Sequence, residues 1–361
     1  MRWISEWGRS RGVSMAVLVV LASAFIIFAE GSLAQKPVVT APESIEIQAR
    51  ELEGFDRIDH SKKQFGRLEW RGGLVLSSPA SEFGGWSGLV LDADGRRLVA
   101  ISDSGAWMTA DLSYRGARPA GLRNAKLGPL RALDGNRLRR GRDRDAEAVT
   151  LADGNLGSGT VLISFEHNHR IGRFRVGPAG VSEPLHYLKL PAEAKRMDNN
   201  AGFESVSVLQ GGRFKGSPIA FSERLPNAEG HHTGWIWVNG ESRRLHLTDM
   251  GGYDITDAAP LRDGGLLVLE RRFRWTEGVK MRLRLLKAAE ILPGAIMQGE
   301  VLLEADMSSQ IDNMEAVSVH YGERGETVVT LMSDDNFNTL LQRTLLLQFT
   351  LLDDARVRAG R

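Results

Sequence analysis

The chain repeats one short pattern five times. In each copy a polar or acidic residue opens an apolar run, a glycine-containing turn follows, and a second apolar run ends at an acid. The opening positions are Ser87, Glu147, Glu204, Asp257 and Glu315, at intervals of 60, 57, 53 and 58 residues. A period of this size is typical of a propeller or a solenoid, so it limits the possible folds more than any other feature.

Each repeat contains several short strands. The apolar runs are rich in Val, Ile, Leu, Trp and Phe, and turns separate them at Asp94-Gly95, Asp153-Gly154, Gly211-Gly212, Asp263-Gly264 and Gly322. Asp-Gly favours tight hairpins because glycine adopts the positive φ that they need. In the second repeat we predict strands over 147–152, 160–166, 170–176 and 184–190. Four antiparallel strands form a propeller blade, so we predict an all-β fold, a β-propeller of four-stranded blades, five by repeat count.

The last repeat supplies only three strands and ends at 345–349. An additional strand-like run lies before the first repeat, at 67–76. We predict that this N-terminal strand completes the last blade and closes the ring. A further strand-like stretch at 44–50 leaves open a six-bladed alternative with one irregular blade.

The N-terminus resembles a secretory signal. Arg2, Arg9 and Arg11 precede an apolar stretch over 13–29, and Ser32-Leu33-Ala34 has the small residues of a cleavage site. We therefore predict a signal peptide at 1–34, an N-terminal extension at 35–65, the propeller domain at 66–352 and a C-terminal tail at 353–361. The expected location is periplasmic or secreted. An uncleaved membrane anchor remains the alternative, because the apolar stretch is long for a signal and short for a membrane span.

The composition limits the classes of partner that the chain could bind. The formal net charge is +1, so no global field attracts nucleic acid, and we expect neither nucleic-acid binding nor membrane association after signal cleavage. The chain has no cysteine, which excludes disulfides and cysteine chemistry. We expect a monomer whose stability comes from packing and ring closure.

The repeated acids are the best clue to function. If the inner strand of each blade starts at one face, the second strand returns to that face, and its closing acid lies near the opening one. The closing acids are Asp103, Glu166, Glu223, Glu270 and Asp334. Clustered carboxylates repel one another and need compensation. A hard cation such as Ca²⁺ would supply it, and so would the nearby arginines Arg144, Arg170, Arg224, Arg271 and Arg272. Alternatively, each acid caps backbone N–H groups at a strand end.

Two function classes follow from an acidic mouth. The first is a metal-dependent hydrolase of phosphate or carboxylic esters, including lactones, that acts on a small-molecule substrate. In it, Glu166 or His167 would be the base, and the metal ligands would come from Glu147, Glu204, Asp257, Glu315, Asp103, Glu223, Glu270 and Asp334. The second is a non-enzymatic propeller that binds a ligand or a protein. No G-x-S-x-G, H-E-x-x-H, P-loop or dinucleotide motif is present.

Several segments together resemble the phytase-like family, also described as esterase-like activity of phytase. They are Ile101-Ser102-Asp103-Ser104-Gly105, Asp145-Ala146-Glu147, Ser164-Phe165-Glu166, Asn200-Ala201-Gly202-Phe203-Glu204, 267–273, 311–315 and Ser333-Asp334-Asp335-Asn336-Phe337-Asn338 with Gln342. The resemblance spans roughly 65–350. It implies a secreted bacterial propeller that is related in name to calcium-dependent phosphoester hydrolases. Propeller phytases have six blades and a basic phosphate site, whereas this chain has five clear repeats and no basic site that aligns.

Overall fold

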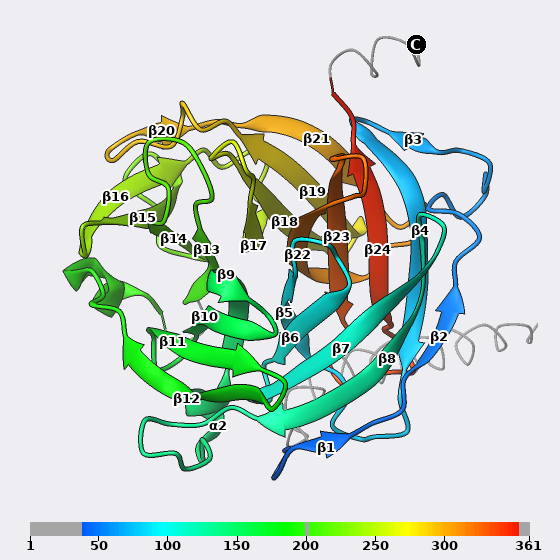
Figure 1. Ribbon diagram of the computed structural model, residues 1–361. Helices are drawn as coiled ribbons and strands as arrows, with labels where there is room; N and C mark the ends of the chain where they lie inside the picture. The colour runs from blue at the N-terminus through cyan, green and yellow to red at the C-terminus, as the bar shows by residue number, and fades with distance from the viewer. Residues whose placement is uncertain (1–37, 199–201, 354–361) are drawn as a thin grey trace, which may run out of the picture. The chain divides into compact units, whose positions relative to one another are not determined.

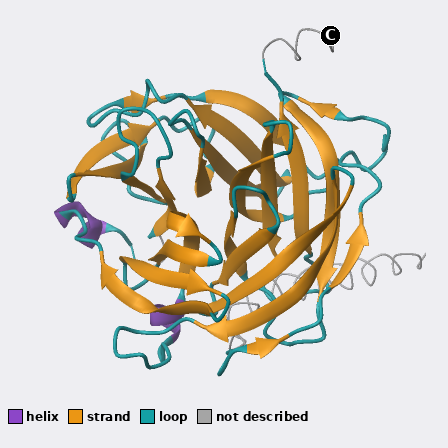
Figure 2. Cartoon of the chain, in the orientation of Figure 1, coloured by secondary structure: helices purple, strands orange, loops and turns teal. Residues whose placement is uncertain are grey.

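The chain folds as a five-bladed β-propeller (Figure 1). The computed structural model describes residues 38–198 and 202–353. Strands make up nearly all the regular structure of these residues, beside two short helical segments, α2 (Gly141–Arg144) and η1 (Ala192–Arg196) (Figure 2). The predicted fold class is confirmed. The predicted signal peptide and nearly all of the predicted tail lie outside the described residues.

Blades one to four are antiparallel meanders of four strands, consecutive in blades one to three and interrupted by one short strand, which joins blade three, in blade four. In blade one they are β5 (Trp86–Leu91), β6 (Arg97–Ser102), β7 (Ala106–Arg115) and β8 (Arg118–Pro129). In blade two they are β9 (Ala146–Asn155), β10 (Ser158–Phe165), β11 (Arg170–Gly177) and β12 (Gly180–Tyr187). In blade three they are β13 (Phe203–Val208), β14 (Pro218–Ser222), β15 (His232–Val238) and β16 (Glu241–Leu247). In blade four they are β17 (Asp254–Pro260), β18 (Leu266–Arg274), β19 (Gly278–Leu286) and β21 (Glu300–Ala305).

Blade five closes the ring as predicted. Its inner strands are β22 (Asn313–Tyr321), β23 (Thr327–Asp334) and β24 (Thr344–Leu351). The fourth strand, β4 (Leu68–Ser77), comes from the N-terminal side and pairs antiparallel with β24, with Leu74 opposite Leu346. The five innermost strands, β5, β9, β13, β17 and β22, contact one another in cyclic order. One sheet thus joins distant parts of the chain and leaves the ring without a gap.

The stretch considered for a sixth blade joins existing sheets instead. Within it, β1 (Glu43–Ser44) pairs with β8 of blade one, and β2 (Gln48–Glu51) pairs with β4 of blade five. The shorter β3 (Gln64–Phe65) also pairs with β4. Another two-residue strand, β20 (Ile296–Met297), runs parallel to β16 at the edge of blade three. The described residues therefore form five blades, and the six-bladed alternative is wrong for them.

The predicted strands of blade two all exist, with boundaries shifted by a few residues. The first strand continues through Asp153-Gly154, and the turn follows at Leu156-Gly157.

Among the described residues no helix is both long and apolar enough to cross a membrane.

Within residues 38–198 and 202–353, the core consists of five apolar clusters, one between each pair of neighbouring blades. Trp86, Trp107 and Trp235 are among the largest fully buried side chains. Burying a large apolar side chain contributes roughly 1.5–3 kcal/mol, so these clusters are the main stabilising term. At the centre Gly88 permits close approach, because a Cβ there would lie 2.9 Å from the Val149 nitrogen of the next blade.

Candidate functional site

Every innermost strand begins with a β-bulge. The pairing of inner and second strands shifts register between Trp86 and Gly88, and at the matching place in the other four blades. A bulge re-aims the extra residue out of the regular ladder. The residues in these bulges are Ser87, Glu147, Glu204, Thr256 and Glu315. They therefore occupy equivalent positions around the ring.

The second strands supply a second set of equivalent residues beside the bulges. Asp103, Glu166 and Glu223 each donate a backbone N–H to the carbonyl two residues before the bulge, on Gly85, Asp145 and Gly202. In blades four and five the equivalent pairs are Asp254 with Arg271 and Asn313 with Asp334. We call this group the acidic mouth; its members are Ser87, Asp103, Asp145, Glu147, Glu166, Glu204, Glu223, Asp254, Thr256, Arg271, Glu315 and Asp334.

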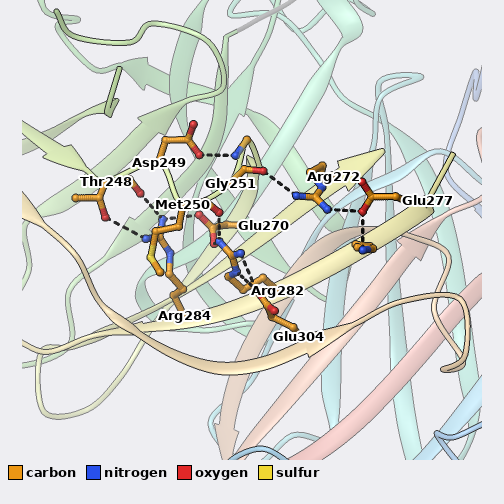
Figure 3. Close-up of polar contacts among 12 residues, drawn as sticks. Thr248, Asp249, Met250, Gly251, Glu270, Arg272, Glu277, Arg282, Arg284 and Glu304 are labelled. Atoms are coloured by element: carbon orange, nitrogen blue, oxygen red, sulfur yellow. Dashed lines mark hydrogen bonds and ion pairs between the residues drawn. The ribbon is translucent and has the colours of Figure 1, made fainter. Parts of the chain in front are cut away.

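Two of the proposed metal ligands are not brought into the acidic mouth. Asp257 is buried and accepts hydrogen bonds from the backbone nitrogens of Val317 and Ala258, both at 2.8 Å, so it acts as a backbone cap. Glu270 is fully buried and pairs with Arg284 and Arg282 (Figure 3). Because side chains alternate along a strand, a shift of one residue moves an acid to the opposite face.

The sequence carried a signal for this shift. Aligned from its first aspartate, Asp254-Ile255-Thr256 matches Asp145-Ala146-Glu147 and places a threonine, not Asp257, at the bulge. The second strand shifts in the same way, so Arg271 takes the place of Glu166. Asp145, Asp254 and Thr256, which were not proposed as site residues, belong to the acidic mouth. Arg271, expected only as a neighbouring counter-charge, replaces an acid of the ring.

Burial, followed by repulsion between neighbouring carboxylates, raises the pKa values of the acids in the mouth. Burial and the neighbouring Asp145, Glu166, Asp103 and Glu315 raise the pKa of Glu147 well above its usual value. Burial and the surrounding carboxylates also raise the pKa of Glu204 well above the usual value.

The effect extends around the ring. Burial, with Asp103 and Glu315 nearby, raises the pKa of Asp334 well above the usual value. Burial raises the pKa of Glu223 to about 7, although Arg224 opposes the shift. Ionisation of these carboxyls in the metal-free acidic mouth is therefore unfavourable.

Arginines compensate only part of this charge. Arg271 donates to Glu315 and Asn313, and Arg224 lies 3.2 Å from Glu223. Two other arginines bind elsewhere. Arg170 donates to the carbonyls of Asp143 and Asn168, and Arg272 donates to Gly251 and Glu277. Arg144 lies against Gly105. Arg224 and Arg271 therefore place their positive charge on blades three to five.

Blades two and three bring together two groups of possible metal ligands. Glu166, Glu204 and Glu223 offer carboxylate oxygens that lie within 4.8 Å of one another. Asp145, Glu166 and His167 form a second group within the same limit, and Glu166 belongs to both. The Gly202 nitrogen donates to Glu166 Oε1 at 2.9 Å, and His167 Nε2 lies 2.8 Å from Asp145 Oδ2. Of the sequence-predicted residues, Glu166, His167, Glu204 and Glu223 are therefore closest to forming a centre.

Comparison with known proteins finds one family. The profile of the phytase-like family, described as "Esterase-like activity of phytase", matches residues 81–337. No curated protein matches the chain.

Among solved structures, the β-propeller domain of Cps50 (Swd1) from Myceliophteria thermophila is 8% identical, with a TM-score of 0.36, covering 83% of this chain and 98% of that one. The Dos1 propeller is 9% identical, with a TM-score of 0.35, covering 84% and 83%.

Proposed function

Because the chain belongs to the phytase-like family, we propose that it is a hydrolase that cleaves phosphate or carboxylic esters at the acidic mouth with the help of a divalent cation. The main observation behind this proposal is the group of Glu166, Glu204 and Glu223, whose oxygens lie within 4.8 Å of one another. The leader-like N-terminus supports a periplasmic or secreted location.

The residues fit a hard cation. Ca²⁺ takes six to eight oxygen ligands at about 2.3–2.6 Å, and two oxygens on one ion lie within about 5 Å of each other. Glu166, Glu204 and Glu223 meet that limit with oxygen atoms alone. The group that contains His167 includes an imidazole nitrogen, which suits a transition metal better than Ca²⁺. We therefore assign Ca²⁺ to the three glutamates.

The chain's own groups then have distinct tasks. Glu166, Glu204 and Glu223 hold the cation, and the Gly202 nitrogen orients Glu166. When bound, a divalent cation polarises an ester oxygen and makes water a better nucleophile. Asp145 orients His167 through Nε2, so Nδ1 is the atom left to accept a proton. Glu315, paired with Arg271, lies on the other side of the ring and contributes negative charge.

A hydrolysis screen tests the proposal. Purified protein is stripped with EDTA, then assayed with and without added Ca²⁺ on p-nitrophenyl phosphate, p-nitrophenyl acetate, phytate and lactones. We expect Ca²⁺-dependent hydrolysis of one class, which Glu204→Gln and Glu166→Gln abolish. His167→Asn should lower kcat about a hundredfold or more while leaving Ca²⁺ binding intact. Glu183→Gln, on the outer strand β12, is the matched control and should have no effect.

The alternative is a propeller that only binds. It gains support if no substrate is hydrolysed, or if activity survives in both Glu204→Gln and Glu166→Gln. Thermal melts separate the cation from the chemistry, because a cation that binds only the folded state raises Tm by mass action. A midpoint unchanged across millimolar Ca²⁺ would rule the cation out.

A further inference from the structure

Three arginines hold one loop of the mouth face. Residues 248–253 connect β16 to β17 and lead directly into Asp254. Arg284 Nη2 donates to the Thr248 carbonyl at 3.0 Å, Arg282 Nη1 to that of Met250 at 2.6 Å, and Arg272 Nη1 to that of Gly251 at 2.8 Å (Figure 3). We call Arg272, Arg282 and Arg284 the arginine clamp. Three of the six residues of the loop are therefore tied through their backbone carbonyls.

The clamp is itself fixed by acids, of which Glu270 is fully buried. Arg284 and Glu270 form an ion pair in which both side chains are fully buried. Arg282 binds Glu304, with its Nε 2.7 Å from Oε1, and also lies 3.6 Å from Glu270. Arg282 and Arg272 both stack on the Tyr253 ring. Replacing a buried ion pair with apolar residues of similar size is often neutral or even stabilising. A gain in stability is therefore a weak explanation for the buried pair of Arg284 and Glu270.

The loop leads into Asp254, which shares the Arg224 guanidinium with Glu223. Arg224 Nη2 lies 3.5 Å from Asp254 Oδ2 and 3.2 Å from Glu223 Oε1. One nitrogen is therefore divided between two acids. Glu223 belongs to the group of three glutamates proposed to hold a cation. If Asp254 moved away, Arg224 would pair with Glu223 alone and compete with a cation for that carboxylate.

We infer that Arg282 and Arg284, fixed by Glu270, are positioning residues of the acidic mouth: they hold the 248–253 loop so that Asp254 shares Arg224 and leaves Glu223 open to a cation. The part of this inference that concerns the cation rests on the proposed function. The part that concerns the loop does not.

The central variant is the double substitution Glu270→Gln with Arg284→Met. It removes both buried charges together and leaves the net charge unchanged, so no lone buried ion remains. The matched control is Arg71→Met with Glu326→Gln, which removes another largely buried pair at 3.1 Å, near the turn that joins β22 to β23. Asp254→Asn removes the acid while the clamp stays intact. Arg282→Lys is milder and removes the bond to Met250 should the double variant fail to fold.

Hydrogen exchange of peptides covering 248–254, measured in EDTA, is the first readout. We expect exchange at least about tenfold faster in the double variant, with wild-type rates in the control and in Asp254→Asn. Calcium titration by calorimetry is the second readout. We expect Kd to rise about fivefold in the double variant and in Asp254→Asn, and no further when they are combined, because both act on Arg224.

Unchanged exchange in both the double variant and Arg282→Lys overturns the inference. Faster exchange with unchanged Ca²⁺ affinity overturns the positioning role. If the wild-type protein binds no Ca²⁺, the proposed function is wrong. Hydrogen exchange alone then tests the arginine clamp. Faster exchange of the 248–254 peptides in the double variant supports the clamp, and unchanged exchange overturns it.

Discussion

One register step separates two roles for an acid in this ring. Glu315 sits in a bulge and interacts with Arg271, whereas Asp257 lies one position beyond its own bulge and caps two backbone N–H groups. Both acids are followed by similar apolar runs, so residue type alone does not distinguish them. The difference comes from where the partner strand pairs, and it can be tested one side chain at a time.

Asp257→Ala should weaken the fold without affecting the cation. The change leaves the buried nitrogens of Val317 and Ala258 without their acceptor. Each unsatisfied buried donor costs roughly 1–3 kcal/mol, so we expect a loss of about 2–6 kcal/mol in the free energy of unfolding. Urea denaturation without Ca²⁺ measures the loss of stability, and the change on adding Ca²⁺ shows whether the variant still binds the cation. A variant that loses its response to Ca²⁺ would return Asp257 to the group of ligands.

Glu223 should make the metal-free protein less stable as pH rises. Its pKa is raised from 4.5 to about 7, so the folded state binds more protons than the unfolded state between these values. Stability is then highest below pH 4.5 and falls as pH rises through 7, by at most about 3 kcal/mol for this group. Glu147 and Glu204 act in the same direction. In EDTA, Glu223→Gln should flatten the dependence of Tm on pH; an unchanged slope would contradict the shift.

At the scale of the element, the sequence predicts strands better than register. The apolar runs and glycine turns located all four strands of blade two, and the spare run at 67–76 correctly predicted the closing strand. The bulges could not be predicted in the same way, because a bulge depends on the pairing of two strands rather than on either one. Glu270 was misplaced for this reason, whereas Glu204 lies in the bulge of its own blade and Glu166 and Glu223 lie beside bulges.

The tight approach of blades one and two gives a prediction at this scale. In Gly88→Ala the new Cβ would lie 2.9 Å from the Val149 nitrogen and 2.9 Å from Ile101 Cγ1. Backbone must shift to relieve this contact, and overpacking of this kind costs about 1–3 kcal/mol. Gly121→Ala, in the outer strand of blade one, is the control, because its nearest neighbour is 3.6 Å away. Equal urea midpoints for the two variants would show that the inner strands can move apart freely.

At the scale of the whole molecule, the apolar contacts that stabilise the fold lie between neighbouring blades. Each apolar cluster draws residues from two neighbouring blades, so no blade buries its faces alone. The N-terminal strand β4 contributes Leu74 to the cluster between blades five and one. Unfolding of one interface should therefore expose the next, and the described ring should melt as a unit.

Leu74→Ala tests this cooperativity. Leu74 is fully buried, and truncating a buried leucine to alanine costs about 2–5 kcal/mol. We expect the urea midpoint to fall equally when followed by tryptophan fluorescence, to which the buried Trp107 and Trp235 of blades one and three contribute, and by far-UV circular dichroism. Separate transitions for the two probes would mean that blades unfold independently.

Ring closure by β4 also has a consequence for how the protein folds. Arg67, just before that strand, donates to the carbonyl of Leu352, 285 residues away, and β4 pairs with β24 along its length. Contacts between residues so far apart in the sequence form slowly, because the entropy cost of closing a long loop comes before the contacts can stabilise the chain. During synthesis, β4 is made long before its partner β24. Until then, a strand edge and apolar surface stay open to other chains, so this protein should depend on chaperones that shield unpaired edges.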